Sequence, residues 1–458
     1  MSSEISRMPL ARIALRQRVM KAGVWSIAGY GINLAIRFGT NLLMTRVLAP
    51  EMFGVMAVAS MIMVGLSMFS DIGLRQNVIQ SSRGNDPSFL NTAWSMQIIR
   101  GLFLWAFAAG ISLTILVAQQ TRFVLSDSVY SAPSLPFVIV AISVTAIISG
   151  FDSTKLLEAS RDLSLSQVTK IDLASQVSGL FVMIAWLLFD QSIWVLVAGS
   201  IGSTATKTVL SHAWLTGTPN RWSWDKPAVR EIFHFGKWLF LSSVLGFFVN
   251  NGDRLLLGGA VSASELGVYV IAFLIYSSAD QIIGKIIIDV IFPALSEVAR
   301  ERRHDLKVSY YKFHAFIAGF SYFCAGVFLV AAPKLIAFLY DPRYGQAGWV
   351  LQLLGLALLT VPFRVATECF LAMGMPQLLS TSTAIRLVTL FVAFPIGVHF
   401  FGFPGAVWAI VLSHFSWVPL QLIYKVLYKL FDLRKEMIAL SFILVGALAG
   451  KVVVQILP

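Results

Sequence analysis

The stretch TAWSMQIIRGLFLWAFAAGISLTILVA, residues 92–118, is long and apolar enough to cross a lipid bilayer as one helix. Such a helix needs about 20 mostly apolar residues. Similar stretches recur along the chain, which has 57% hydrophobic and 13% charged residues and a mean hydropathy of +0.77. Membrane-spanning strands would instead give short alternating segments. The sequence therefore predicts an all-α polytopic membrane protein and excludes a soluble enzyme, a disordered chain and a disulfide-rich secreted domain.

Thirteen segments are candidate spans, and because their boundaries are approximate we expect about 12–14 transmembrane helices. They cover residues 22–44, 52–72, 92–118, 132–150, 168–189, 192–214, 236–257, 265–293, 313–332, 347–370, 378–400, 403–424 and 437–457. The longest gaps, near 215–235 and 294–312, are far shorter than the roughly 50 residues of an independent domain. Transport or chemistry is therefore expected within the bilayer.

The distribution of basic residues predicts the orientation. The formal net charge is +12, and 24 lysines and arginines fall in the amino-terminal segment, in the gaps after even-numbered spans or in the parts of spans that border these gaps, against four in the other gaps. The positive-inside rule then places the amino terminus in the cytoplasm, and no nucleic-acid partner is expected. Residues 8–22 should form an amphipathic helix on the inner surface rather than a cleavable signal peptide. Segment 221–235, with Trp222, Trp224 and Pro227, should lie there too.

An internal repeat relates the two halves of the chain at an offset of 213 residues. Nine of forty positions are identical, among them Gly23 and Gly236, Trp25 and Trp238, Gly39 and Gly252, and Gly54 and Gly267. Six spans separate the first span from the seventh, so both halves run in the same direction, as in some alternating-access transporters. We predict an N-lobe at 1–214, a cytoplasmic linker at 215–235, a C-lobe at 236–424, and a cytoplasmic loop with an extra span at 425–458.

Seven basic residues lie inside predicted spans, where each would cost about 2.5–3.5 kcal/mol at a helix centre. They are Arg37, Arg100, Arg254, Lys285, Arg364, Arg386 and Lys451. Lipid-facing positions are disfavoured, so these side chains should reach the interface, pair, or line a wet cavity. Arg364 is expected to pair with Glu368, and pairing of Lys285 with Asp289 competes with a functional role, because both pairs are four residues apart.

The first and seventh spans carry matching polar positions. Tyr30, Asn33, Arg37 and Asn41 form one stripe because they recur at intervals of three and four. At the repeat-equivalent positions, Asn250 replaces Arg37 and Arg254 replaces Asn41. Two interpretations stay open, which are hydrogen-bonded packing between helices and a basic, water-filled vestibule between the lobes.

Soluble-enzyme motifs are missing from the chain. No H-E-x-x-H, C-x-x-C, G-x-x-x-x-G-K or G-x-S-x-G occurs, which disfavours zinc hydrolysis, ATP-driven transport within this chain and acyl transfer. We expect no cofactor and no metal. Gly446 and Gly450 form a G-x-x-x-G in the last span, which suits internal helix packing or dimerisation, and internal packing is our expectation.

Four stretches carry a family resemblance. They are TRVLAPEMFG from Thr45, DIGLRQNVIQ from Asp71, ELGVYVIAFLI from Glu265 and FPALSEVARERRHD from Phe292. Together they resemble the polysaccharide-exporter branch, the Wzx-type lipid-linked oligosaccharide flippases, of the multidrug/oligosaccharidyl-lipid/polysaccharide (MOP) superfamily. The resemblance implies two parallel six-helix lobes around a central cavity lined by the first two helices of each lobe. The family usually has twelve or fourteen spans, and thirteen are counted here.

The resemblance implies a flippase, not an enzyme, that moves a polyprenyl-diphosphate-linked oligosaccharide across the bacterial cytoplasmic (inner) membrane. The product would be O-antigen, capsule or exopolysaccharide. We expect a monomer embedded in the bilayer, with a polysaccharide polymerase as a candidate partner. The candidate substrate-binding residues are Asn33, Arg37, Asn41, Asn250, Arg254, Asp280 and Lys285. Arg161, in a predicted cytoplasmic loop, is expected to tolerate alanine.

Two alternatives stay open. A cation-coupled multidrug antiporter of the same superfamily should have acidic residues in its spans, and the clear ones here are few: Asp253, Asp280 and Glu368. A membrane-embedded polysaccharide polymerase or ligase should carry a large outward loop with catalytic residues. The longest predicted outward loop, 333–346, is short.

Overall fold

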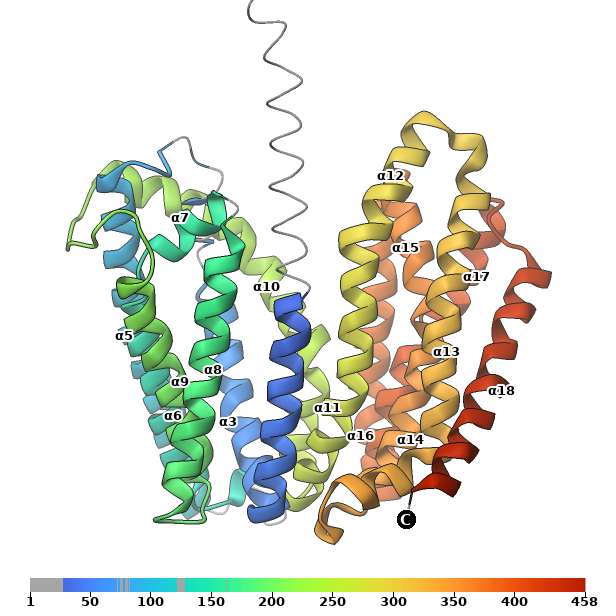
Figure 1. Cartoon of the computed structure of the whole chain (residues 1–458), viewed down its shortest axis with the longest axis horizontal. Helices are drawn as coiled ribbons and strands as arrows, with labels where there is room; N and C mark the ends of the chain where they lie inside the picture. The colour runs from blue at the N-terminus through green and yellow to red at the C-terminus, as the bar shows by residue number, and fades with distance from the viewer. Residues whose placement is uncertain are drawn as a thin grey trace, which may run out of the picture. The chain divides into compact units, whose positions relative to one another are not determined.

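The computed structural model describes residues 28–457, apart from 72, 75–76, 79–80, 82, 122–127 and 163. The regular elements of this part of the chain are all helical (Figure 1), which confirms the predicted fold class. In hydrocarbon, a helix satisfies its backbone groups within one segment. Seven described helices are long and apolar enough to cross a membrane, or eight if the bent pair α6–α7 is one span. The predicted surface helix at 8–22 lies outside the described residues.

The chain forms two compact units, and unit 1 consists of Met1–Leu48, Val58–Val124 and Tyr130–Phe247. Its described helices are residues 28–47, most of α3 (Pro50–Phe69), α5 (Pro87–Gln120), α6 (Leu135–Gly150), α7 (Lys155–Arg161), α8 (Leu165–Leu187), α9 (Trp194–Ala213) and the first part of α10 (Lys226–Ala260). The short turn η1 (Val129–Ser131) precedes α6.

A side chain of α5 forms hydrogen bonds with the backbone between α6 and α7, where the chain bends by 66°. Such a break leaves carbonyl groups at the end of α6 without helical partners. Gln97 Nε2 donates to the carbonyls of Ser149, Gly150 and Asp152 at 2.9, 3.2 and 3.2 Å. One amide nitrogen, with its two N–H donors, therefore lies within hydrogen-bond distance of three backbone oxygens at the bend.

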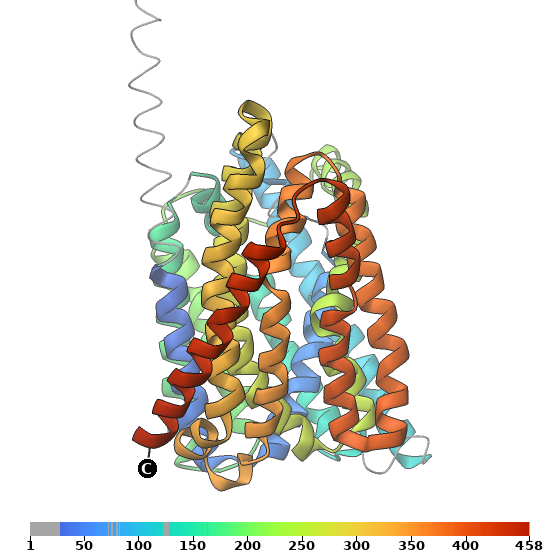
Figure 2. The same ribbon diagram turned by 90° about the vertical axis from the view of Figure 1, so that its right-hand side faces the viewer.

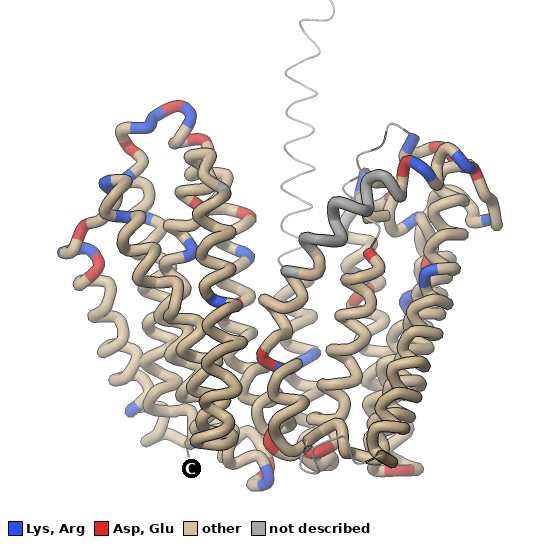
Figure 3. Tube along the Cα trace, turned by 180° about the vertical axis from the view of Figure 1, so that it is seen from behind, with Lys and Arg blue, Asp and Glu red and all other residues tan. Residues whose placement is uncertain are grey.

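Unit 2 consists of Ala49–Ala57, Leu125–Val129 and Phe248–Pro458. Its helices are the last part of α10, α11 (Ala263–Ile286), the π-helical turn η2 (Ile287–Ile291), α12 (Phe292–Glu301), η3 (Arg303–Asp305), α13 (Leu306–Leu339), η4 (Pro342–Tyr344), α14 (Ala347–Ala357), η5 (Leu358–Thr360), α15 (Pro362–Ala372), α16 (Pro376–Phe415), α17 (Val418–Leu427) and α18 (Leu433–Ile456). Lys, Arg, Asp and Glu residues lie mainly near the helix ends of both units (Figure 3).

Helix α16 consists of two limbs joined at Gly402, whose φ of 60° and ψ of −141° are not helical. This region of backbone space is essentially confined to glycine. The limbs touch closely, since a Cβ on Gly397 would lie 2.4 Å from the Gly405 carbonyl oxygen. The turn falls between the predicted spans 378–400 and 403–424 and brings residues far apart in sequence together.

Helices α13 and α18 run side by side in the same direction (Figures 1 and 2). Contacts advance together along both helices, from Tyr311 with Glu436, through Gly326 with Ile443, to Val330 with Gly450, and Lys307 of α13 donates to the Phe431 carbonyl just before α18. A Cβ on Gly446 would lie 2.1 Å from the Phe323 carbonyl oxygen. The predicted internal packing of the G-x-x-x-G is therefore confirmed.

An ion pair joins α17 to α18. Lys425, whose side chain is fully buried, pairs with Glu436. The Lys425 ammonium also lies over the rings of Tyr310 and Phe363 at 5.3 and 5.2 Å. Removing one partner of such a buried pair is strongly destabilising, because it leaves a buried charge uncompensated.

The segment 221–235 differs from its prediction as a separate surface helix. Residues 221–225 are not helical, and α10 begins at Lys226 and continues through the predicted span 236–257. Pro227 occupies the first turn, where its missing N–H has no cost. Since no proline follows Pro227 within the helix, one 35-residue helix forms where a linker and a span were predicted.

Candidate functional site

A polar cavity of about 550 Å³ lies within unit 2. Helices α10, α11, α15 and both limbs of α16 surround it. Its charged or titratable lining residues are Asp253, Arg254, Asp280, Arg364, Glu368, Arg386 and His414, and Asn250 and Tyr276 also line it. So many ionisable groups in apolar helices are a marker of a functional site.

One arginine of the cavity is paired across helices. Arg364 of α15 donates through Nη1 to Asp280 Oδ1 of α11 at 2.7 Å, with about a third of each side chain exposed. The prediction that Arg364 pairs with Glu368 is therefore wrong. The i,i+4 rule considers only one helix, whereas α11 presents a carboxylate directly to the guanidinium.

The other two arginines have no carboxylate partner among the described residues. Arg254 lies over the ring of Phe273 at 4.1 Å, a cation–π contact that leaves its hydrogen-bond donors available. Arg386 Nη2 lies 3.1 Å from His414 Nε2. Because guanidinium only donates, this His414 nitrogen accepts, and the imidazole is neutral in this arrangement. Two cationic groups in the cavity are therefore available to an anion.

The acidic residues of the cavity are used differently. Asp253 accepts a hydrogen bond from the hydroxyl of Tyr269 on α11, and Asp280 is paired with Arg364. Half-buried Glu368 forms no ion pair with any described basic residue. Besides the Arg254 and Arg386 guanidinium groups, the cavity therefore offers one carboxylate that can bind a proton or a cation.

The structure brings together three of the predicted residues of unit 2 and leaves out one. Asn250, Arg254 and Asp280 line the cavity. Lys285 is not among its lining residues, and its Nζ lies 3.9 Å from Asp289 Oδ2. The competing interpretation of Lys285 as a member of an ion pair is therefore supported.

The predicted residues of unit 1 lie on the helix formed by residues 28–47. Asn33 Oδ1 accepts a hydrogen bond from Gln176 of α8 at 3.0 Å, which is the helix-packing role left open by the sequence. Asn41 Nδ2 donates to the backbone carbonyl of Arg37 at 3.0 Å, and the Arg37 side chain is exposed. Whether these side chains share a cavity with Arg254 stays a prediction.

Sequence reasoning missed the contact of Arg386 with His414. The two residues are 28 positions apart, which would be about 42 Å along one straight helix. Only the turn at Gly402 brings them together. The glycines around the turn are a signal that could have suggested a hairpin, but not which side chains it pairs.

The family described as "Polysaccharide biosynthesis protein" matches residues 43–348 of the chain. Among curated proteins, the chain is 19% identical over 350 residues to the lipopolysaccharide biosynthesis protein WzxC of Escherichia coli (strain K12), covering 75% of this chain and 67% of that protein. It is 21% identical to the succinoglycan biosynthesis transport protein ExoT of Rhizobium meliloti (strain 1021), covering 73% and 65%. An uncharacterized membrane protein of Klebsiella pneumoniae is 21% identical, covering 66% and 60%. The chain thus spans between 60% and 67% of the length of these relatives.

Two solved structures share the fold. One is an inward-facing multidrug resistance MATE family transporter of the MOP superfamily, with a TM-score of 0.61, 14% identity, and coverage of 93% of this chain and 95% of that one. The other is the lipid II flippase MurJ in an inward closed conformation, with a TM-score of 0.61, 13% identity, and coverage of 95% and 97%. At these identities the likeness establishes the fold alone, which is an all-α fold of many membrane helices as predicted.

Proposed function

Because this chain belongs to the polysaccharide biosynthesis protein family, we propose that it is a flippase for a polyprenyl-diphosphate-linked oligosaccharide. It would act in the bacterial cytoplasmic membrane by alternating access and supply a surface polysaccharide. The names of two relatives refer to lipopolysaccharide and succinoglycan, which supports a glycan-linked substrate.

The observation that carries this proposal is a pair of arginines, Arg254 and Arg386, in a cavity between apolar helices, neither of which pairs with a carboxylate of the described residues. A diphosphate linked to sugars is anionic and hydrophilic, so it needs a polar path with cationic partners to cross hydrocarbon. Guanidinium groups bind phosphate oxygens through strong, charge-assisted hydrogen bonds. We propose Asn33, Arg37 and Asn41 as substrate contacts of unit 1.

The membrane potential can contribute to the driving force of this step. With an inside-negative potential, outward movement of a negative charge is favoured by about 2.3 kcal/mol per charge per 100 mV. The membrane potential can then make outward movement of the substrate favourable without ATP hydrolysis.

A complementation experiment tests the proposal. A deletion strain should accumulate lipid-linked repeat units on the inner leaflet, and the wild-type gene should restore export. Arg254→Ala and Arg386→Ala should each reduce export about tenfold or more at normal membrane levels, because each removes a charge-assisted contact. Arg254→Lys should retain part of the activity, since a point charge remains.

Arg300→Ala is the matched control, because Arg300 is an exposed arginine of α12 outside the cavity and should be silent. Unchanged export without accumulation in the deletion strain would refute the function. Full export from a well-expressed Arg254→Ala/Arg386→Ala double variant would refute only the cavity assignment.

One observation favours a second candidate, a cation-coupled multidrug antiporter. Glu368 places a carboxylate without an ion-pair partner among the described residues in the same cavity. Efflux of cationic dyes from cells expressing the protein, abolished by Glu368→Gln, would support this alternative. Dye efflux equal to that of the deletion strain would exclude it.

A further inference from the structure

Arg100 lies where two hollows of unit 1 meet. A polar cavity of about 680 Å³ is lined by Asp71, Gln97, Arg100 and Asp152, among others. A mainly apolar groove of about 510 Å³ between α3 and α5 is lined by Phe69, Phe103, Phe107, Trp224 and the same Arg100. Both volumes fall in the range of ligand sites, roughly 300–1,000 Å³. The Arg100 guanidinium therefore borders both the polar cavity and the apolar groove.

The guanidinium of Arg100 is oriented without a direct ion pair in the described part of the chain, although Asp71, which lines the same cavity, acts on its charge. Its Nε donates to Ser70 Oγ at 3.0 Å, and its Nη2 donates to the Ser67 carbonyl at 2.7 Å and to Ser67 Oγ at 3.3 Å. Its Nη1 has no hydrogen-bond partner in the described part of the chain, and no described carboxylate lies within ion-pair distance. A guanidinium that is held in place beside an apolar groove and keeps unused N–H donors is suited to bind an anion.

The groove follows one face of α5. It runs from Met96 to Phe107, about 16 Å at 1.5 Å per residue, with Arg100 between its two ends. Beyond Arg100, Phe103 and Phe107 are 62% and 64% exposed. A groove along one helix face suits a single hydrocarbon chain better than the paired chains of a bilayer phospholipid.

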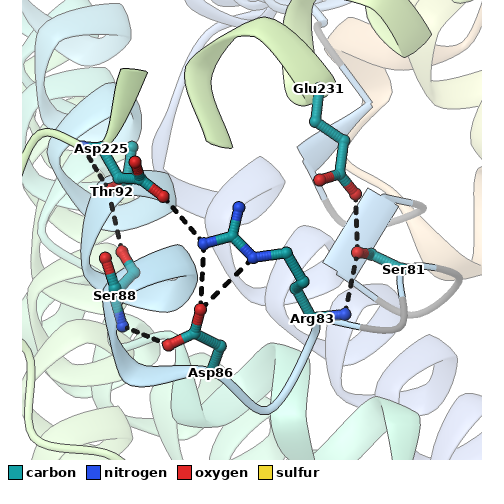
Figure 4. Close-up of polar contacts among 7 residues, drawn as sticks. All are labelled: Ser81, Arg83, Asp86, Ser88, Thr92, Asp225 and Glu231. Atoms are coloured by element: carbon teal, nitrogen blue, oxygen red, sulfur yellow. Dashed lines mark hydrogen bonds and ion pairs between the residues drawn. The ribbon is translucent and has the colours of Figure 1, made fainter. Parts of the chain in front are cut away.

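The opposite end of the groove is fixed by the chain segment before α10. Ser223 N–H donates to Ser95 Oγ and Asp225 N–H to Thr92 Oγ1, both at 3.0 Å, so Trp224 between them is held against α5. Arg83 Nη2 bridges Asp225 and Asp86 at 2.8 and 3.0 Å (Figure 4). Its hydrogen bond holds the pKa of Asp86 below the ordinary value. The groove thus has an anchored indole at one end and phenyl rings at the other.

We propose that this groove binds the isoprenoid chain of a polyprenyl diphosphate, with its phosphate on Arg100 and its polar head toward the polar cavity. The proposal rests on the proposed function and deepens it, because it assigns a binding site in unit 1 to the carrier lipid. The charge of Arg100 selects an anionic lipid, and the single groove selects one chain.

Photo-crosslinking of the full-length protein in phosphatidylcholine nanodiscs tests the site. The photoreactive residue p-benzoylphenylalanine is incorporated at Phe103 or, as a matched control, at Phe181, which is 67% exposed on α8 and does not line the groove. Tritium-labelled polyprenyl diphosphate should label the Phe103 position at least about fivefold more than the Phe181 position. Excess unlabelled polyprenyl diphosphate should abolish the difference, whereas uncharged polyprenol and phosphatidylglycerol should not.

Arg100→Gln should reduce labelling at Phe103 about tenfold, the effect of losing about 1.4 kcal/mol of binding free energy. Because Arg100 also holds α3, Phe107→Ala serves as a second variant. It removes a groove wall at an exposed position, so labelling should fall while the thermal unfolding midpoint stays unchanged.

Each other outcome overturns a distinct statement. Equal labelling at both positions, in a protein that restores export to the deletion strain, would refute the groove and leave the flippase function intact. Competition by phosphatidylglycerol as strong as by polyprenyl diphosphate would identify a bilayer phospholipid as the occupant and refute the proposal. Absence of both labelling and export would refute the proposed function itself.

Discussion

At the scale of single residues, the neighbours of each intramembrane arginine determine what it can do. Arg364 is paired with Asp280, so its charge stabilises a contact between α11 and α15. Arg254 is held by an aromatic ring and Arg100 by hydroxyl and carbonyl oxygens, and these partners orient a guanidinium without cancelling its charge. Only the latter kind can bind an anionic substrate without first breaking an ion pair.

The identity of the Arg364 partner gives the first prediction. Asp280→Asn should lower the free energy of unfolding by about 1–2 kcal/mol, since the pair is about one-third exposed, and Glu368→Gln should change it by less than about 0.5 kcal/mol. Thermal unfolding of the purified protein in detergent measures both. If Glu368→Gln lowers the free energy of unfolding as much as Asp280→Asn does, the result would instead support pairing of Arg364 with Glu368.

Arg161 gives the second prediction and corrects the expectation that alanine is tolerated there. Its Nη1 donates to the carbonyls of Val78 and Ser81 at 2.6 and 2.7 Å. Arg161→Ala should therefore destabilise unit 1 by about 1.5–3 kcal/mol, the range for hydrogen bonds to a charged group. Gly84→Ala should act similarly, because its Cβ would lie 2.1 Å from the same Nη1.

The exposed Arg300→Ala is again the control for Arg161→Ala, measured by the same thermal unfolding. If both arginine variants unfold at the wild-type temperature, the two carbonyl contacts do not contribute to stability. The charge of Arg161 and its position in a predicted loop indicated a solvated side chain. These features do not show which backbone carbonyls lie next to the guanidinium in the folded protein.

At the scale of elements, apolar runs identify the helices well and their ends poorly. The predicted span 92–118 lies inside α5, which begins at Pro87 after the N-cap Asp86, and the predicted span 313–332 lies inside the longer α13. The apolar run measures the part that needs hydrocarbon, whereas caps and prolines decide where a helix begins. Contacts across elements, such as Arg364 with Asp280, depend on packing that periodicity does not encode.

The repeat gives the third prediction, at a contact between the starts of α3 and α11. A Cβ on Gly54 would lie 2.0 Å from the Ala263 carbonyl oxygen, and one on Gly267 would lie 1.9 Å from the Pro50 carbonyl oxygen. Both glycines and both carbonyls are 213 positions apart, so the contact is reciprocal, as a two-fold relation between the repeats would produce. This reciprocity supports the repeat.

Gly54→Ala and Gly267→Ala should each destabilise the protein by about 1–3 kcal/mol, the usual effect of overpacking. The double variant should lose less than the sum by about 1 kcal/mol or more, because one substitution already opens the shared contact. Thermal unfolding measures the cycle, with Gly110→Ala as the control at a helical glycine with free space around it. Strict additivity would show that the two sites are independent.

At the scale of the whole chain, α18 determines on which side the chain ends. The thirteenth predicted span, 437–457, has two possible explanations, namely an outward carboxyl end or a segment that does not cross the membrane once. The contacts with α13 favour the first, because they advance in the same direction along both helices, from Tyr311 with Glu436 to Val330 with Gly450, and the 24 residues of α18 extend about 36 Å. The end of α18 therefore lies on the same side as the loop at Arg343 and opposite the loop at Arg302.

Reporter fusions test this topology in cells. Fusions at Arg83, Arg221 and Arg302 should report cytoplasm, because basic residues are concentrated in those gaps, and fusions at Asp127, Arg343 and after Pro458 should report the outer side. The informative comparison is between Arg302, Arg343 and Pro458, since unit 2 links them through α13 and α18. A cytoplasmic signal after Pro458 together with an outer signal at Arg343 would contradict the parallel packing of α13 and α18. Reversal of all six signals would instead overturn the orientation while leaving that packing intact.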